Sequence, residues 1–153
     1  QNTLPLLKIA VIHELSNEKS KTKPIYEKIL RISPDNPVAL NNLAYMMAES
    51  GVDLDQALTY AQRAKQKLPN NPDVADTLGW LYIKKNLSDD AIKIFRDLLQ
   101  MKPDHVTWRY HLAIALFQKG DKLQAKKELE AALKYNPRQD EMSKIKELMN
   151  RIG

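Results

Sequence analysis

Apolar and polar residues alternate along the chain with the spacing of amphipathic helices, most clearly between Pro72 and Pro103. An apolar series centred on Leu78-Gly79-Trp80 is followed by a polar break at Asn86 and by a second apolar series. Apolar residues that recur every three or four positions indicate helices. Asn86 tolerates the left-handed conformation at a helix end, and Pro103 cannot continue a helix. The stretch therefore predicts two helices joined by a tight turn.

The same unit recurs at a period of 34 residues. The prolines that end the units are Pro34, Pro69, Pro103 and Pro137, and the turn residues are Asn17, Gly51, Asn86 and Gly120. One extra residue between Gly51 and Ala57 interrupts the period, at a surface turn where an insertion costs little. We expect an all-α chain of antiparallel helix pairs in a single domain over 1–153. The predicted repeats are 3–36, 37–71, 72–105 and 106–139, followed by a capping helix at 140–152.

Capping residues mark the predicted helix starts. Asn36-Pro37 and Asn71-Pro72 combine a side chain that caps free amides with a proline that loses no hydrogen bond at the first helical position. Asp104 and Asp121 are expected to cap the two helices of the fourth repeat. The sequence thus predicts where four of the helices begin.

The first repeat fits the period least well because Pro24 lies inside its second helix. Proline is tolerated only in the first turn of a helix, so this helix is expected to start near Lys23. Residues 16–22 would then form a polar, mobile loop. His13 falls at a core position of the repeat.

Composition narrows the possible functions. The chain has 153 residues and no cysteine, which excludes disulfides and thiolate metal sites. No apolar run approaches the roughly 18 residues of a membrane span, so we expect a soluble protein. The absence of cysteine suits the cytoplasm and the periplasm alike, which leaves the compartment open. The net charge is +5, but basic residues interleave with acidic ones at helical spacing. Because no continuous basic stripe is visible, nucleic-acid binding is not expected.

We find no arrangement of residues that predicts catalysis, a metal or a cofactor. His105 and His111 are six residues apart, which places them on different helix faces. Asp89-Asp90 begins a predicted helix, where acidic residues favour the macrodipole without any acid–base role. We therefore expect neither an enzyme nor a bound cofactor.

The recurring pairs of a large and a small residue resemble the tetratricopeptide repeat. These pairs are Leu43-Ala44, Leu78-Gly79 and Leu112-Ala113, and the second helices repeat an alanine at Ala57, Ala91 and Ala125. The resemblance covers about 3–139 and implies a right-handed α-solenoid. A tryptophan is common at the fourth position of each repeat, where this chain has Leu40, Ala75 and Arg109. The phrases Leu40–Tyr45 and Asp76–Trp80 are similar to those of bacterial tetratricopeptide proteins, including lipoproteins of exopolysaccharide export.

The resemblance also implies that the first helices line a concave groove. Positions two, five, nine, twelve and thirteen of each repeat would point into it. These positions hold Val38, Asn41, Tyr45, Ala48, Glu49, Asp73, Asp76, Trp80, Ile83, Lys84, Thr107, Tyr110, Ile114, Phe117 and Gln118. From this set we select as partner-binding residues Asn41, Tyr45, Asp73, Asp76, Trp80, Lys84, Tyr110 and Ile114.

Three of the selected residues, Tyr45, Trp80 and Tyr110, would form an aromatic track across three repeats. Aromatic side chains are common anchors of protein interfaces. The alternative is that each ring packs on the adjacent helix. We expect the groove to hold an apolar or aromatic segment, with a basic residue that meets Asp73 and Asp76.

Some members of this family hold chaperone tails with a clamp of basic residues. At the matching places this chain has Leu7, Val11, Asn42, Asp73 and Thr77. Because basic residues are missing there, we expect no binding of such tails.

We therefore expect a protein-interaction scaffold that binds a peptide or helix of a partner. The alternative is a structural spacer or self-association unit of a longer repeat protein, in which the chain forms a homo-oligomer or serves a bacterial envelope or exopolysaccharide-export system. The chain starts without Met in mid-pattern, so Leu4, Leu6, Leu7 and Ile9 would pack on a preceding helix.

Overall fold

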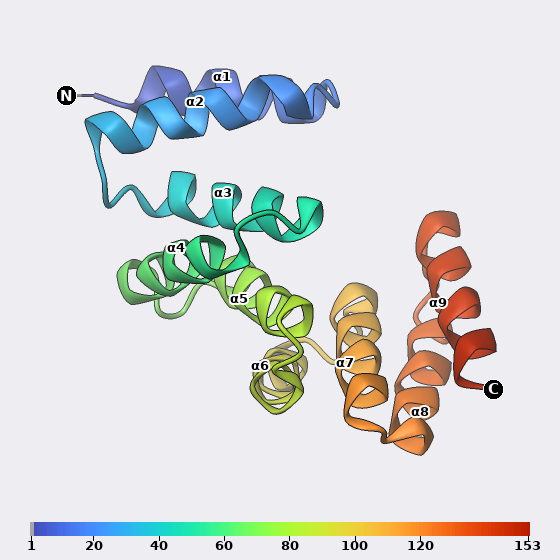
Figure 1. Cartoon of the computed structure of the whole chain (residues 1–153). Helices are drawn as coiled ribbons and strands as arrows, with labels where there is room; N and C mark the ends of the chain where they lie inside the picture. The colour runs from blue at the N-terminus through green and yellow to red at the C-terminus, as the bar shows by residue number, and fades with distance from the viewer. Residues whose placement is uncertain (1) are drawn as a thin grey trace. The chain divides into compact units, whose positions relative to one another are not determined.

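The structure, a computed structural model, describes residues 2–153 and contains helices but no strands in that range (Figure 1). The helices are α1 (Leu4–Leu15), α2 (Lys19–Ile32), α3 (Pro37–Ser50), α4 (Leu54–Lys67), α5 (Pro72–Lys84), α6 (Ser88–Met101), α7 (Val106–Lys119), α8 (Lys122–Leu133) and α9 (Gln139–Ile152). The prediction of an all-α fold is confirmed. The chain divides into two compact units, Gln1–Leu81 and Tyr82–Gly153, and the division falls within α5.

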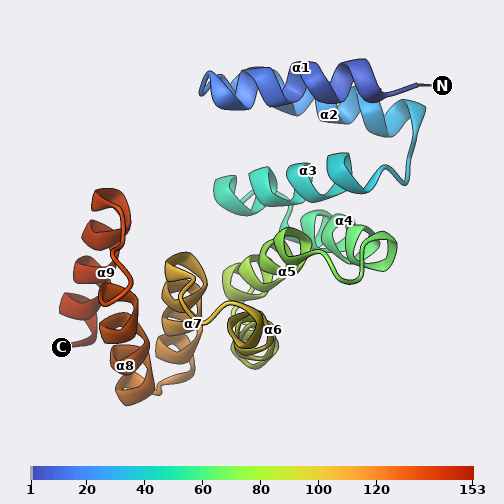
Figure 2. The same ribbon diagram turned by 180° about the vertical axis from the view of Figure 1, so that it is seen from behind.

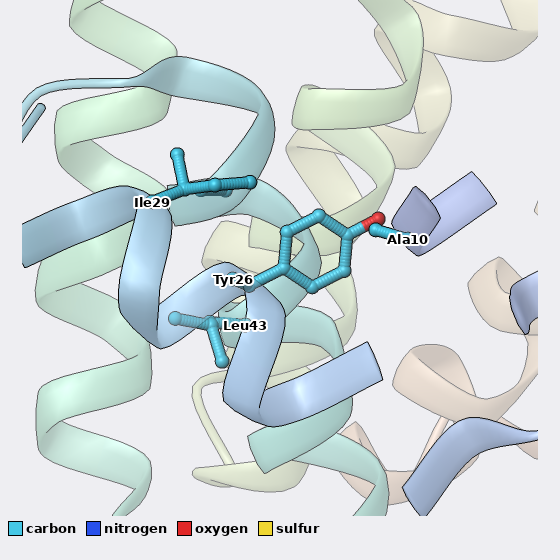
Figure 3. Close-up of a cluster of buried hydrophobic side chains, with 5 residues drawn as sticks. Ala10, Tyr26, Ile29 and Leu43 are labelled. Carbon is cyan, nitrogen blue, oxygen red and sulfur yellow. The ribbon is translucent and has the colours of Figure 1, made fainter. Parts of the chain in front are cut away.

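In the first unit, α1 and α2 lie side by side and α2 packs on α3, as both views show (Figures 1 and 2). Their shared core contains Ala10 of α1, Tyr26 and Ile29 of α2, and Ala39 and Leu43 of α3. Figure 3 shows the Tyr26 ring surrounded by Ala10, Ile29 and Leu43. The small alanines let neighbouring helices approach closely enough for the large side chains to fill the space between them.

In the second unit, α7 packs against both α6 and α8. Arg109 of α7 occupies the place where a tryptophan is common in such repeats, and it makes a 2.6 Å ion pair with Glu128 of α8. Its guanidinium group also lies 5.4 Å from the centre of the Tyr135 ring. Arg109 thus joins α7 to α8 through one ion pair and also contacts the Tyr135 ring just after α8, where other repeats use an apolar ring.

The last helix, α9, presents an apolar stripe to α7 and α8. Ile145, Leu148 and Ile152 are buried, and Met142 and Met149 are half-buried. These are the five residues that the sequence pattern places on one stripe. Burial of such a stripe is how a terminal helix covers the apolar face of a repeat array.

Most helix starts and turns agree with the sequence prediction. Asn36, Asn71 and Asp121 accept backbone N–H bonds from Ala39, Val74 and Gln124 at 3.1, 3.2 and 3.1 Å. The predicted turn residues have positive φ angles, of 57° at Asn17, 68° at Gly51, 57° at Asn86 and 93° at Gly120. Glycine and asparagine adopt this conformation more easily than other residues, so the choice of residue explains each turn.

The expected cap at Asp104 is wrong. The cap of α7 is His105, whose Nδ1 atom accepts a 3.3 Å hydrogen bond from the Trp108 backbone N–H. The imidazole also stacks on the Trp108 indole, with ring centres 3.8 Å apart. The stacking explains why a histidine replaces the usual aspartate or asparagine, since it adds ring contact to the hydrogen bond.

The expected start of α2 near Lys23 is also wrong, because α2 begins at Lys19 and contains Pro24 in its interior. Residues 16–18 alone separate α1 from α2, so most of the expected mobile loop is helical. Just before this start, the Glu18 carboxylate contacts Lys21 and His13 at 2.6 Å each. The Lys21 ammonium, and after it His13, lower the pKa of Glu18. His13 is only partly buried, so its predicted core position is not a fully buried one.

A candidate protein-binding surface

Six residues on α3 and α5 of the first unit form a surface that we call the α3–α5 patch. Its members are Asn41, Tyr45 and Glu49 of α3, and Asp73, Asp76 and Trp80 of α5. Residues spaced by three or four positions share one face of a helix. The spacing within each trio therefore places its members on a common helix face.

A hydrogen bond and electrostatic contacts join the two halves of the patch. The Trp80 indole Nε1 donates to the Glu49 carboxylate at 2.7 Å, which fixes the ring of α5 against α3. The pKa of the Tyr45 phenol is raised, first by burial and then by the negative charges of Glu49 and Asp76. Tyr45 nevertheless remains 44% exposed, and Trp80 is half-buried. Both rings are thus positioned and partly accessible.

Asn41 lies at the end of a polar chain that runs through the first unit. The Asn41 side-chain amide donates to Asn42 at 3.3 Å, Asn42 donates to the Tyr26 hydroxyl at 2.6 Å, and Tyr26 donates to Glu14 at 2.6 Å. The Asn41 Oδ1 atom is buried and has no hydrogen-bond partner within residues 2–153. An acceptor left unpaired in this way costs free energy, which makes Asn41 notable beside the two rings.

The chemical character of the patch is anionic and aromatic. Glu49, Asp73 and Asp76 supply three carboxylates, and Lys84, one turn after Trp80 at the end of α5, supplies one ammonium group. The indole N–H of Trp80 is already directed at Glu49. The surface therefore offers mainly hydrogen-bond acceptors and ring faces.

The other predicted residues lie in the second unit. Tyr110 is half-buried on α7, and its pKa is raised by burial and by Glu147 of α9, with Arg151 acting in the opposite direction. Arg151 also lies 6.0 Å from the centre of the Phe117 ring. Ile114 is half-buried one turn after Tyr110, and Lys84 is exposed at the end of α5. Because Tyr110 belongs to a different unit from Tyr45 and Trp80, the continuous aromatic track stays a prediction.

Two of the wider set of groove positions are buried, and a third makes hydrogen bonds within the second unit. Ala48 and Ile83 are buried, so the expectation that they line a groove is wrong. Gln118 donates from its side-chain amide to the Ile83 carbonyl at 3.2 Å and to Asn86 at 3.4 Å. It thereby fastens the end of α7 to the turn before α6. At Ala48 and Ile83 the side chain therefore contributes to the core, whereas exposed Gln118 makes hydrogen bonds.

Two residues that contact the selected partner-binding residues were not themselves selected from the sequence. Glu49 belongs to the wider set of positions, but its bond to Trp80 joins successive first helices and depends on their spacing. Arg151 lies in a helix that was assigned only a capping role. Continuing the 34-residue period into α9 places Arg151 at the twelfth repeat position, which is the signal that could have found it.

Metal ligands and membrane spans are the two remaining features that bear on function. In the described part of the chain, no three His, Asp or Glu side chains are grouped closely enough to hold a metal ion. None of the helices there has both the length and the apolar character needed to cross a bilayer.

Fold and surface together define a helical-repeat protein whose distinctive feature is a half-exposed aromatic and acidic face. Family models described as tetratricopeptide repeat match residues 25–59 and 78–150. The chain belongs to the tetratricopeptide repeat family, whose fold generally serves as a scaffold for protein–protein interaction and typically carries no catalytic site.

The curated relatives are much longer proteins. A TPR repeat-containing protein of Pseudomonas aeruginosa is 27% identical over 96 residues, which is 63% of this chain and 16% of that protein. The peroxisomal targeting signal receptor of Candida glabrata is 28% identical over 131 residues, or 78% of this chain and 22% of the receptor. The chain thus spans about a fifth of the length of these relatives.

Solved structures show the same fold at low sequence identity. A thermophilic TPR protein of Thermus thermophilus has a TM-score of 0.82 at 17% identity, covering 99% of this chain and 84% of that one. MamA of MSR-1 has a TM-score of 0.73 at 17% identity, covering 99% of this chain and 98% of its own. Both confirm the helical-repeat solenoid.

Proposed function

We propose that the chain binds an extended or helical segment of a partner protein on the α3–α5 patch. The supporting observation is the 2.7 Å hydrogen bond from Trp80 to Glu49, which fixes a half-buried indole beside the 44% exposed Tyr45. Ordered aromatic rings at a surface lose little side-chain entropy on binding and are frequent interface anchors. The segment would lie across α3 and the first part of α5.

Site-specific photocrosslinking tests this proposal. A benzophenone amino acid replaces Val38, which is 41% exposed and lies on the α3 face of Asn41, one turn earlier. The control position is Leu123 of α8, which is 64% exposed and remote in sequence. We expect Val38 to label a defined segment of a partner, identified by mass spectrometry, and Leu123 not to label it.

The labelling must also depend on the rings of the patch. Adding Tyr45→Ala and Trp80→Ala should remove the Val38 crosslink while circular dichroism stays unchanged. Equal labelling from Val38 and Leu123, or labelling that survives loss of both rings, would show that the patch is not the binding surface.

A second candidate, self-association, is favoured by the apolar surface of α1. Ile12 is 59% exposed and Leu15 is 83% exposed, although neither contributes to the described core. Sedimentation equilibrium separates the two functions, because a dimer held by α1 should dissociate in an Ile12→Lys variant. Leu7 is a poor choice for this test because it packs against the core cluster. A monomer at all concentrations would exclude this candidate.

A further inference from the structure

One face of α1 is apolar although it is exposed. We call it the α1 outer face, and it consists of Leu4, Lys8, Val11, Ile12 and Leu15. These positions are three or four residues apart, so they lie side by side along the helix. The four apolar members are all exposed, and α1 lies at an edge of the first unit with α2 beside it (Figures 1 and 2). Exposed apolar surfaces of this kind mark contacts with another molecule.

Lys8 lies in the middle of the α1 outer face and limits what can cover it. Leu4 precedes Lys8 by one turn, and Ile12 follows it by one turn. Glu14 is the one acidic residue of α1, and its carboxylate accepts a hydrogen bond from the Tyr26 hydroxyl in the core. A molecule that covers the face must therefore bring a negative charge to the Lys8 ammonium group or leave it in water.

The helix next to α1 adds further positive charge. Residues 4–32 contain six Lys and Arg but three Glu, whereas residues 33–81 contain three Lys and Arg but six Asp and Glu. Glu14, Glu18 and Glu27 each contact a side chain within the α1–α2 hairpin. The exposed basic residues without an acidic partner in residues 2–153 are Lys8, Lys19, Lys28 and Arg31.

A second copy of the chain fits this face poorly. In a symmetric dimer the same face meets itself, so two Lys8 ammonium groups would enter one apolar interface. The α1 outer face contains no carboxylate that could pair with either group, and an unpaired charge taken out of water is costly. An apolar helix of another protein would meet the same cost.

The surface of an anionic bilayer meets both requirements. Its acyl region accepts apolar side chains, and its headgroup phosphates lie where a lysine ammonium group can reach them while its methylene stem stays among apolar groups. The negative surface potential of such a bilayer also attracts the remaining basic residues of the hairpin.

We propose that the α1 outer face binds the surface of a bilayer that contains anionic lipid, with α1 parallel to the membrane plane and Lys8 beside the headgroup phosphates. The inference goes beyond the proposed function, because α1 contributes no residue to the α3–α5 patch. It competes with self-association for the same face, and the experiments below separate the two.

Sedimentation with vesicles tests this binding. The full chain is mixed with sucrose-loaded vesicles of phosphatidylcholine alone, or of equal parts phosphatidylcholine and phosphatidylserine, and the bound fraction is measured after centrifugation. We expect binding to the anionic vesicles and an affinity lower by about tenfold or more for phosphatidylcholine alone, which corresponds to about 1.4 kcal/mol. Binding should weaken as salt is raised, because salt screens the attraction between opposite charges.

Variants at exposed positions change the face without removing core contacts. Ile12→Ser combined with Leu15→Ser should weaken binding to anionic vesicles by about tenfold, because both side chains lose their contact with the acyl region. Leu123→Ser on α8, where the side chain is 64% exposed, should have no effect. Lys8→Glu should also weaken binding by about tenfold, whereas the same charge change at exposed Lys93 of α6 should alter it little.

The absence of cysteine allows a label to report which residue meets the lipid. A nitroxide label on Leu15→Cys should become accessible to oxygen and protected from a water-soluble nickel complex when anionic vesicles are added. The same label on Leu123→Cys should remain in water.

Three results would overturn the inference. The first is absence of binding to anionic vesicles. The second is a Leu123 label that enters the lipid while the Leu15 label stays in water, which would assign the contact to the second unit. The third is a dimer that does not bind vesicles and dissociates when Ile12 and Leu15 are both replaced by serine, which would make a second copy the occupant. None of these results changes the Val38 crosslink, so the proposed function is tested separately.

Discussion

Tyr26 is the residue on which the polar chain of the first unit depends. It is fully buried, accepts a hydrogen bond from Asn42 and donates one to Glu14. Its ring also fills the core between α1, α2 and α3. One side chain therefore contributes both apolar contact and the middle link of a hydrogen-bonded chain.

Replacing Tyr26 with phenylalanine should keep the ring contacts and remove the middle link. Asn42 and Glu14 would then each lose a hydrogen bond to the Tyr26 hydroxyl, which costs about 1–3 kcal/mol in the free energy of unfolding. Urea denaturation measures this loss, with Tyr60→Phe as the control because Tyr60 is a half-buried tyrosine that packs against the same core cluster. A loss no larger than that of the control would show that the chain contributes nothing to stability.

The same variant makes a prediction for alkaline pH. Burial, and after it the Glu14 carboxylate, raises the pKa of Tyr26 above its usual value near 10. The unfolded chain therefore loses this proton at a lower pH than the folded chain, so stability present below about pH 10 declines above it. Between about pH 9 and 11, Tyr26→Phe should lose stability less steeply than the natural chain.

Single residues differ in how far their roles could be predicted. Asn36 and Asn71 were assigned correctly because asparagine followed by proline is a pair that strongly favours a helix start. Asn41 was selected for its repeat position, but its orphaned oxygen depends on where Asn42 and Tyr26 lie in space. Contacts of that kind have no signature in local sequence.

Among the helices, α7 has the most unusual beginning. His105 caps it through the Nδ1 atom, which accepts a 3.3 Å hydrogen bond from the Trp108 backbone N–H. The imidazole also stacks on the Trp108 indole, with ring centres 3.8 Å apart. One side chain thus contributes both a helix cap and ring contact.

A His105→Ala variant tests this assignment, because it removes the cap and the stacked ring together. The free energy of unfolding should fall by about 0.5–2 kcal/mol for the cap alone. A His105→Asn variant keeps an acceptor, so it should recover the contribution of the cap but not that of the ring contact. Urea denaturation measures both variants, and an equal loss of stability in the two would contradict the assignment of His105 as a cap.

Element boundaries were predicted well where a local signal decides them and poorly where a contact between helices does. The turns at Gly51 and Gly120 follow from glycine alone. The beginning of α2 does not, because Tyr26 and Ile29 of this helix are buried in the core that it shares with α1 and α3, and this burial stabilises the helix in spite of Pro24. A rule that reads proline alone misplaces this helix.

At the scale of the molecule, the N-terminal helix of the repeat array is less buried than a helix of its interior. In α1 only Ala10 is fully buried, whereas α3 buries five residues between neighbouring helices. Helices with few buried contacts open at lower free energy. The first unit should therefore lose structure progressively from its N-terminal helix.

Hydrogen exchange tests this order. Backbone amides of α1 should exchange at least tenfold faster than those of α3, because a tenfold ratio needs only about 1.4 kcal/mol of difference in opening free energy. An Ile12→Lys variant provides the control for self-association, which would protect α1. Equal protection of α1 and α3 in that variant would contradict the expected order.

The period was sufficient to predict the all-α repeat fold because many positions agree across the repeats. It was not sufficient to predict the candidate surface. Glu49 and Trp80 lie on different repeats, and their pairing depends on the distance between α3 and α5.

Positive charge is distributed unevenly between the two units. Gln1–Leu81 has nine basic and nine acidic residues, whereas Tyr82–Gly153 has fifteen basic and ten acidic residues.

The left-handed asparagines at the turns have a consequence for the chemical ageing of the protein. Asparagine deamidates when the backbone nitrogen of the next residue attacks the side-chain amide. Glu18 follows Asn17, and its backbone N–H donates a 2.8 Å hydrogen bond to the His13 carbonyl. Leu87 follows Asn86, and its backbone N–H donates a 2.8 Å hydrogen bond to the Tyr82 carbonyl. After Asn136 the next residue is a proline, whose nitrogen has no hydrogen to lose. The geometry that needs asparagine at these turns therefore also slows the reaction that would convert it to aspartate.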